Sequence, residues 1–209
     1  MDDQEQLRNA LSDDARMRFE ARYERLASWD VDFPQPVFVD LAARGLIRSP
    51  VLDVGCGSGE IALFLAAQGY DVWGIDLVGA AISRARAKAV KRGLPAARFL
   101  VGDALRLEEL GMTFETIVDS GLFHAFCEEE RPFFVAGLAA VLRPGGLYHF
   151  LGFSDRQPGK DGPRRLTEAE IRKTFGNGWR IVSLQEARFL THIHDGGAQA
   201  WLGSIERVE

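Results

Sequence analysis

Residues 51–60 constrain the fold of this chain more than any other stretch. They read V-L-D-V-G-C-G-S-G-E, an apolar run followed by three glycines at alternate positions, and residues 61–68 then have the composition of a helix. A strand, a tight turn and a helix in this order place backbone N–H groups at the carboxyl end of a buried strand. Glycine lets a ligand approach the backbone closely. The stretch therefore predicts a ligand site at one edge of an α/β sheet.

The charges around this turn narrow the kind of ligand. The dinucleotide pattern G-x-G-x-x-G would need a glycine where this chain has Glu60, and Asp53 precedes the first glycine by two positions. A carboxylate is a poor neighbour for a pyrophosphate and suits a ligand that carries positive charge. The turn therefore favours a cationic ligand, and a nicotinamide-dependent oxidoreductase is the weaker alternative.

Composition indicates one globular domain. The chain has 209 residues with 25 basic and 30 acidic side chains, a net charge of −5 that argues against a nucleic-acid partner. It has two cysteines, one of them inside the glycine turn, so we expect neither a disulfide framework nor a metal site. The sequence shows no membrane-spanning run and no signal peptide at its acidic start. We expect a cytoplasmic monomer or homodimer.

The first part of the chain predicts a helical extension. Residues 1–12 are polar and are expected to fray, and Ser12 is placed to cap a helix. This helix would carry an apolar stripe of Phe19, Tyr23 and Leu26. We divide the chain into an N-terminal extension, 1–28, and a single domain, 29–209. The extension either packs on the domain or covers the ligand mouth as a lid.

Strands and helices alternate through the rest of the chain. Strands are predicted at 72–76, 98–101, 116–119 and 148–153, with helices at 80–92 and 128–142. The Pro-Gly-Gly at 144–146 is expected to end the second of these helices, and Thr167 with Glu170 is a capping box for a short later helix. Two long strands, 179–189 and 198–208, would form a terminal hairpin around a loop at 190–197.

Two carboxylates follow predicted strands. Asp76 stands about 20 residues after Gly55, the spacing at which a carboxylate reaches ribose hydroxyls in this architecture. Asp103 follows the third strand, where it would accept a hydrogen bond from an adenine amino group. A helix-capping Asp76 and a turn-forming Asp103 are the structural alternatives.

The loop after the fourth strand is the expected reaction site, because it leaves the sheet at the topological switch point. We expect Phe123, Phe126 and Phe153 to wall a dry acceptor pocket, with core packing as the alternative for each. His124 is the candidate general base, because histidine titrates near neutral pH, and Asp155 could orient a substrate. A supporting role for His124 and a solvated Asp155 are the alternatives.

Five motifs resemble those of the class I S-adenosylmethionine (SAM)-dependent methyltransferases. They are W-D-x-x-x-P-Q-P, V-L-D-V-G-C-G-S-G-E, V-D-S-G-L-F-H-x-F, V-L-R-P-G-G and G-P-R-R-L-T-E-A-E-I-R. More narrowly, these motifs resemble a bacterial group of small enzymes that is similar to the thiopurine, thiol, halide and heterocyclic-toxin methyltransferases. The resemblance implies a Rossmann-like doubly wound sheet of seven strands, order 3-2-1-4-5-7-6, with the last strand antiparallel and helices on both faces.

The resemblance also implies an activity and a set of contacts. Methyl transfer from SAM to an O, S or N atom of a small aromatic or heterocyclic molecule would leave S-adenosylhomocysteine (SAH); a SAM-binding protein without turnover is the alternative. Asp53 would lie near the methionine ammonium, and Asp76 would bind the ribose. The other implied SAM contacts are Trp29, Gln35, Gly55, Cys56, Gly57, Gly59, Leu77, Asp103, Ala104 and Ser120.

Overall fold

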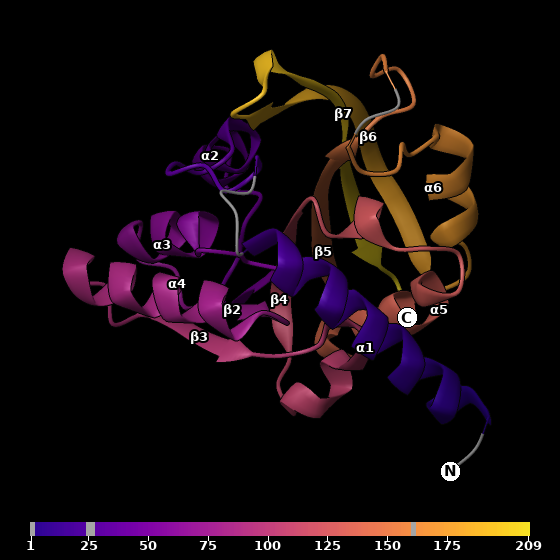
Figure 1. Cartoon of the computed structure of the whole chain (residues 1–209), viewed down its shortest axis with the longest axis horizontal. Helices are drawn as coiled ribbons and strands as arrows, with labels where there is room; N and C mark the ends of the chain where they lie inside the picture. Colours follow the sequence, from indigo (N-terminus) through magenta and orange to yellow (C-terminus); the bar gives the residue numbers. More distant parts are fainter. Residues whose placement is uncertain (1–2, 24–27, 160–161) are drawn as a thin grey trace.

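The computed structural model describes residues 3–23, 28–159 and 162–209. Within these ranges one seven-stranded sheet has the order β3-β2-β1-β4-β5-β7-β6 (Figure 1), as the sequence predicts. β1 to β5 are parallel, and β7 runs antiparallel to both of its neighbours. The strands are β1 (Val51–Val54), β2 (Val72–Asp76), β3 (Ala97–Val101), β4 (Phe114–Ser120), β5 (Leu142–Phe153), β6 (Trp179–Thr191) and β7 (His194–Arg207).

Helices cover both faces of the sheet. They are α1 (Asp3–Tyr23), α2 (Pro36–Ala43), α3 (Glu60–Ala67), α4 (Gly79–Arg92), α5 (Glu130–Val141) and α6 (Glu168–Thr174), with short 3₁₀ helices η1 (Ala104–Leu110) and η2 (Phe123–Ala125). Successive residues of a strand point to opposite faces. Val51 accordingly joins the core cluster under α2, α3 and α4, whereas Leu52 joins the one under α5 and α6. Burial on both faces explains why the parallel strands are almost continuously apolar.

The N-terminal helix begins earlier than the sequence predicts. α1 starts at Asp3, so Ser12 is a buried mid-helix residue and not a cap. Contacts with η1 hold the polar first turns, since the Arg8 guanidinium donates to the Leu105 carbonyl and Arg106 forms an ion pair with Glu5 at 2.7 Å. These are tertiary contacts, which a local pattern does not reveal. Of the predicted apolar stripe, Leu26 and the side chain of Tyr23 lie outside the described structure.

Two predicted boundaries in the second half of the chain are wrong. β6 continues to Thr191 and β7 begins at His194, so the hairpin turn is only 192–193 and not 190–197. β5 begins at Leu142 and not at residue 148, because Leu142 already has an extended backbone and pairs with Phe114 of β4. α5 ends at Val141, one residue before the predicted end. Because the two strands are longer than predicted, the tip of the hairpin lies at the functional site described below. The predicted capping box at α6 is confirmed.

Candidate functional site

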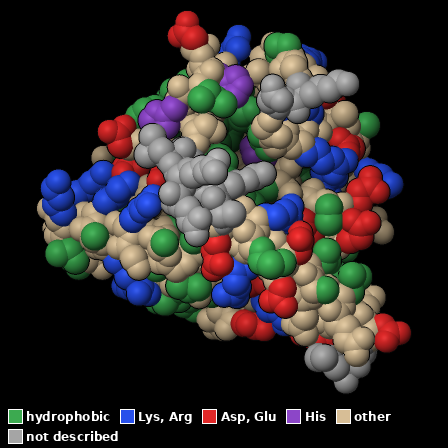
Figure 2. Space-filling model, viewed as in Figure 1, with side chains coloured by type: hydrophobic (Ala, Val, Ile, Leu, Met, Phe, Trp, Pro, Cys, Tyr) green, Lys and Arg blue, Asp and Glu red, His purple; other side chains and the backbone are tan. Residues whose placement is uncertain are grey.

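A cavity of about 330 Å³ lies at the carboxyl ends of the parallel strands. Its wall combines α1, residues 28–35, the glycine turn, the loop after β4 and the tip of the β6–β7 hairpin. On the outside, hydrophobic and histidine side chains gather around a hollow on one face (Figure 2). The volume is in the range of small-molecule sites, and such sites typically combine a mostly apolar wall with a few polar groups.

The glycine turn between β1 and α3 forms one side of this cavity. Gly55, Gly57 and Gly59 all have positive φ, at 69°, 55° and 87°. A Cβ at Gly59 would lie 2.8 Å from the Phe99 ring, and a Cβ at Gly55 would lie 3.0 Å from Leu122. Both glycines are therefore required by backbone conformation and by packing, since the turn is pressed between β3 and the loop after β4.

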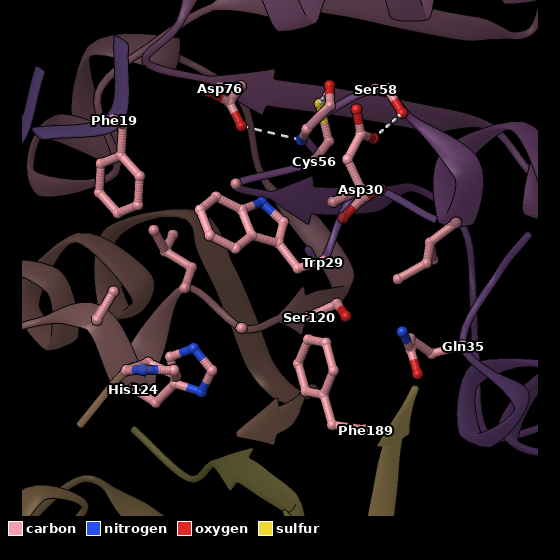
Figure 3. Close-up of a pocket in the computed structure, with 18 of the residues that line it drawn as sticks. Phe19, Trp29, Asp30, Gln35, Cys56, Ser58, Asp76, Ser120, His124 and Phe189 are labelled. Atoms are coloured by element: carbon pink, nitrogen blue, oxygen red, sulfur yellow. Dashed lines mark hydrogen bonds between the residues drawn. The ribbon is translucent and has the colours of Figure 1, made fainter. Parts of the chain in front are cut away.

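Two buried carboxylates order the turn. Asp76 accepts hydrogen bonds from Gly57 N–H and from Val78 N–H, both at 2.9 Å, so it fixes the turn before α4 and also holds the glycine turn (Figure 3). Asp53 accepts one from Ala62 N–H at 3.1 Å. Burial raises the pKa of the Asp53 carboxyl to about 8 and also raises the pKa of Asp76. A cationic ligand would stabilise the ionised form of both groups.

Glu60 has a different role from the one the turn pattern indicates. It is buried at the start of α3, where its carboxylate pairs with Lys88 at 2.7 Å and with Arg92 at 2.9 Å, both on α4. Two cations thus neutralise it within the protein. Asp53 and Asp76, and not Glu60, are therefore the carboxylates that disfavour a pyrophosphate at this turn.

Asp103 follows β3, as predicted, and caps η1 by accepting a hydrogen bond from Leu105 N–H at 2.8 Å. Its neighbour Ala104 and the residue after β2, Leu77, line the same part of the cavity. We call this part the acidic half. Its acidic lining residues are Asp30, Asp53, Glu60, Asp76 and Asp103.

Residues 28–35 form the side of the cavity next to the glycine turn. Trp29 lies in the middle of the site, between Asp76 on one side and His124 and Phe189 on the other (Figure 3). Asp30 anchors this segment, because it accepts a hydrogen bond from Ser58 Oγ at 2.5 Å. Gln35 Nε2 donates a hydrogen bond to the Leu190 carbonyl at 2.8 Å, and Gln35 Oε1 accepts one from Leu190 N–H at 2.9 Å. The side chain of Gln35 therefore links the segment to β6.

Asp119, near the end of β4, organises the loop on the opposite side. Its carboxylate accepts hydrogen bonds from Leu122 N–H (2.7 Å), Phe123 N–H (3.0 Å) and Tyr148 OH (2.7 Å). Burial raises the pKa of this carboxyl to about 7. The loop that it fixes brings Ser120 and His124 to the cavity wall.

His124 is buried on η2 and has a defined orientation. Phe153 N–H donates a hydrogen bond of 2.9 Å to His124 Nδ1. The imidazole lies edge-on to the Phe153 ring at 5.3 Å and is tilted against Phe189 at 5.9 Å. The surroundings of this histidine are thus mainly aromatic.

The predicted acceptor wall is only partly present. Phe126 and Phe153 line the cavity, joined by Phe19, Phe189 and His194, and with His124 these residues define the aromatic half of the site. Phe123 instead points into the core, where its ring contacts Phe134, Phe150 and Phe175. Phe123 and His124 are neighbours in sequence, but Phe123 lies in the core and His124 lines the cavity.

Asp155 is also absent from the cavity wall within the described residues, because its carboxylate turns toward Trp201 Nε1 at 3.4 Å. Several lining residues are not among the predicted contact residues. Phe189, Thr191, Ile193 and His194 come from the hairpin, and Ala15 and Phe19 come from α1. Only the packing of distant segments brings them together.

Among the described residues there is no cluster of histidine, cysteine, aspartate or glutamate suited to a metal ion. The helices in those same ranges also lack any long apolar segment of the kind that crosses a membrane.

Comparisons with known proteins agree with this geometry. Residues 51–146 match a family model described as a methyltransferase domain. The chain is 32% identical to 2-heptyl-1-hydroxyquinolin-4(1H)-one methyltransferase of Mycobacteroides abscessus, over 90% of this chain and 89% of that protein. It is also 32% identical over 137 residues, 62% of this chain and 46% of the relative, to an S-adenosyl-L-methionine-dependent Diels-Alderase, iccD, of Talaromyces variabilis.

A solved structure described as "Conversion of a Disulfide Bond into a Thioacetal Group during Echinomycin Biosynthesis" is similar in both sequence and fold. It is 39% identical, superposes with a TM-score of 0.78, and the match covers 86% of this chain and 84% of that one. Similarity on this scale, over the whole domain, agrees with the sheet order and the glycine turn. The chain belongs to the SAM-dependent methyltransferases.

Proposed function

We propose that this chain transfers the methyl group of SAM to an oxygen, sulfur or nitrogen atom of a small aromatic or heterocyclic acceptor in the cytoplasm. The observation that carries the proposal is the division of one cavity into an acidic half on the strand ends and an aromatic half opposite. The first suits a cationic adenosyl ligand, and the second suits a flat apolar one. The M. abscessus relative, named for a hydroxyquinolinone substrate, supports an acceptor of this kind.

The residues of the acidic half fit SAM. The three positive-φ glycines leave room for a ligand against the backbone, and buried Asp53 has one carboxylate oxygen bound to Ala62 N–H. We assign Asp53 and Ser120 to the methionine end, Asp76 to the ribose, and Asp103 with Ala104 and Leu77 to the adenine. Trp29 and Cys56 would cover the ligand, and Gln35 would hold the covering segment in place through Leu190.

When bound, SAM supplies a methyl group already activated by a positively charged sulfur. The protein then has to align the acceptor with that methyl group and to exclude water, and alignment alone can contribute roughly 7–11 kcal/mol in favourable models. Phe126, Phe153 and Phe189 exclude water from the acceptor side. Leu122, seated against Gly55, keeps the acceptor loop in contact with the glycine turn.

The N-terminal extension acts as a lid in this proposal. Ala15 and Phe19 of α1 line the cavity, and α1 lies across the front of the molecule between η1 and α5 (Figure 1). Arg18 binds Glu130 of α5 at 3.0 Å, and Arg8 binds Glu108 of η1. The helix is thus attached to the adenine side and to the acceptor side of the site.

Titration calorimetry with SAM and with SAH tests the first part of the proposal, and we expect micromolar binding of both. Lack of binding to either ligand would refute it. A mass-spectrometric screen of thiols, phenols and hydroxyquinolines then tests turnover. Binding without any methylated product would favour the second candidate, a SAM-binding protein that does not transfer methyl groups, which the Diels-Alderase relative makes worth testing. A fluorescence change with NADH would instead revive the oxidoreductase alternative.

A further inference from the structure

The hydrogen bond to His124 Nδ1 decides which nitrogen of this side chain carries the proton. Phe153 N–H is a donor, so Nδ1 must offer it a lone pair, and a neutral imidazole then has its hydrogen on Nε2. The bond is buried and only 2.9 Å long. The backbone also passes close to the ring, since a Cβ on Gly152 would lie 3.4 Å from His124 Cβ and one on Gly121 would lie 3.5 Å from His124 Cε1.

This tautomer leaves His124 no basic atom for an incoming acceptor. Nδ1 is occupied by the Phe153 amide, and Nε2 already holds a hydrogen. A protonated ring would also bring an N–H at Nδ1 against the N–H of Phe153. A general base must lie within hydrogen-bond reach of the proton that it removes and must have a lone pair for it. Nε2 is the ring nitrogen of His124 left for an acceptor, and it has a hydrogen to donate in place of a lone pair. His124 therefore does not meet the second condition.

His194, the other histidine of the aromatic half, has a similar arrangement. Its Nδ1 lies 2.8 Å from Thr191 Oγ1. That oxygen accepts hydrogen bonds from the backbone N–H groups of Ile193 and His194, at 3.3 and 3.2 Å, so its own hydroxyl hydrogen is directed to the ring. Within the described lining of the aromatic half, the titratable side chains are these two histidines, and no carboxylate is among them.

The charges around the aromatic half also favour an anionic acceptor. The Arg165 guanidinium lies 5.1 Å from the centre of the Phe153 ring. Phe153 lines the cavity, so this positive charge is close to the aromatic half. Among the described residues of the cavity wall, the carboxylates are all in the acidic half. An anion is therefore better accommodated beside His124 than a cation is, because it meets N–H donors and a nearby positive charge there.

Resting on the proposed function, we propose that His124 serves the methyl acceptor as a hydrogen-bond donor through Nε2–H, and that the acceptor's nucleophilic atom is already anionic at neutral pH. The substrate class is thus acidic: aryl thiols, N-hydroxy heterocycles and electron-poor phenols. The anion forms its bond to the methyl carbon while the carbon–sulfur bond breaks and its electron pair returns to sulfur. Anion and sulfonium cation become two neutral groups, and no proton is released.

The test measures the ionisation of a bound probe, 4-nitrophenol, whose phenolate absorbs visible light. In protein saturated with SAH we expect the pKa of the bound probe to fall by about one unit, a tenfold preference for the anion. His124→Phe removes the donor and should abolish this fall. His124→Gln keeps an N–H donor but is not a base, and it should retain part of the fall. His192→Gln, the same change at an exposed histidine of the hairpin tip, should leave the pKa of the bound probe at the wild-type value.

Turnover gives a second readout. With two thiophenols of different acidity, the inflection of kcat/KM against pH should follow each acceptor's own ionisation. His124→Phe should lower the plateau about 10- to 100-fold, the value of a hydrogen bond to a charged group, without moving the inflection. A general base would instead give one inflection common to both acceptors, lost in both His124→Gln and His124→Phe.

That common inflection would overturn the proposal. So would a bound 4-nitrophenol whose pKa is unchanged or raised, or wild-type protein that binds SAH but not 4-nitrophenolate. Absence of SAH binding would refute the proposed function by itself. If SAH binds but the bound 4-nitrophenol prefers its neutral form, the role proposed for His124 is refuted and the proposed function is not. Thermal melting of each variant identifies any loss of folding, and His124→Gln keeps the test decisive if His124→Phe does not fold.

Discussion

The acidic half and the aromatic half of the cavity are built in different ways. The acidic half is assembled from the ends of adjacent parallel strands and the turns that follow them, so Asp53 and Asp76 lie close to where local sequence places them. The aromatic half combines α1, the loop after β4, the end of β5 and the tip of the hairpin. One half follows from a local strand–turn–helix pattern, whereas the other depends on how distant segments pack. We expect ligand affinity to be set in the first half and acceptor choice in the second.

The largest expected effect tests the acidic half. Asp76→Ala removes the acceptor of the Gly57 and Val78 N–H bonds and the proposed ribose contact, so SAM should bind about 100-fold more weakly, roughly 2.7 kcal/mol. Asp71→Ala is the matched control, since Asp71 stands just before the other end of β2, where it is exposed and pairs with Arg98. Calorimetry compares the two. Equal losses of affinity would mean that Asp76 acts only through overall folding.

The next prediction concerns pH. Burial raises the pKa of Asp53 to about 8 and that of Asp119 to about 7, so between pH 4 and these values the folded protein holds protons that the unfolded chain has released. Stability must therefore fall as pH rises through this range. Between pH 7 and 8 the free energy of unfolding of ligand-free protein should drop by up to about 1.4 kcal/mol. Burial lowers the pKa of His149 to about 4, which acts in the opposite sense but only below about pH 6.5.

Asp53→Asn is the variant for this prediction, with urea unfolding at several pH values as the measurement. It should reduce the slope between pH 7 and 8 and leave the smaller contribution of Asp119. Saturating SAM should also reduce the slope in the wild type, because its positive charge favours the ionised Asp53. A wild-type stability that rises with pH in this window would show that the two carboxyls are not protonated in the folded state.

A pair of phenylalanine variants separates the aromatic half from the core. Phe123→Leu should cost about 1.5 kcal/mol of stability and leave the acceptor KM nearly unchanged, because this ring packs among Phe134, Phe150 and Phe175. Phe126→Leu should raise the acceptor KM about fivefold, because this ring lines the cavity. Chemical denaturation and steady-state kinetics are the two measurements. If Phe123→Leu changed KM more than Phe126→Leu, the division between wall and core would be wrong.

The smallest effect is expected where residues 28–35 meet the glycine turn. Ser58→Ala removes the hydrogen bond from Ser58 Oγ to Asp30 and its contact with Lys88 Nζ at 2.7 Å. SAM affinity should fall about fivefold, the value of one hydrogen bond, mainly through faster dissociation. Ser83→Ala is the control, because Ser83 Oγ donates its hydrogen bond within its own helix, to the Gly79 carbonyl. Stopped-flow release of SAM distinguishes the variants, and identical rates in both would remove Ser58 from the closing contact.

Predictions from the sequence were best where chemistry is local. The glycine turn, the strand ends that carry Asp76 and Asp103, and the capping box at Thr167 are all where the pattern indicates, since each is fixed by neighbours within a few residues. The order of the sheet was also correct, through the resemblance to a known fold. The start of α1 and the length of the hairpin were wrong, because ion pairs to η1 and pairing across β6 and β7 decide them.

The aromatic half shows what a linear pattern does not contain. Phe123 and Phe126 are the same residue type in one short segment, but only Phe126 lines the cavity. Asp119 holds the backbone at Phe123, where η2 begins, and this ring packs into the core. From the sequence, Phe189 is not separable from an ordinary core residue, and for the helix of Phe19 packing and covering are both open. The hairpin and α1 meet at the same opening, and this contact brings both rings to the cavity wall.

The sequence by itself determined the kind of fold and the acidic edge that meets a cationic ligand, because glycine conformation and strand-end carboxylates depend on residues close together in the chain. Only the tertiary structure decided which rings face the acceptor and which nitrogen of His124 carries the proton. That nitrogen is set by a backbone N–H of β5, 29 residues away in sequence. A hydrogen bond over such a separation has no local signature, because folding alone brings its donor and acceptor together.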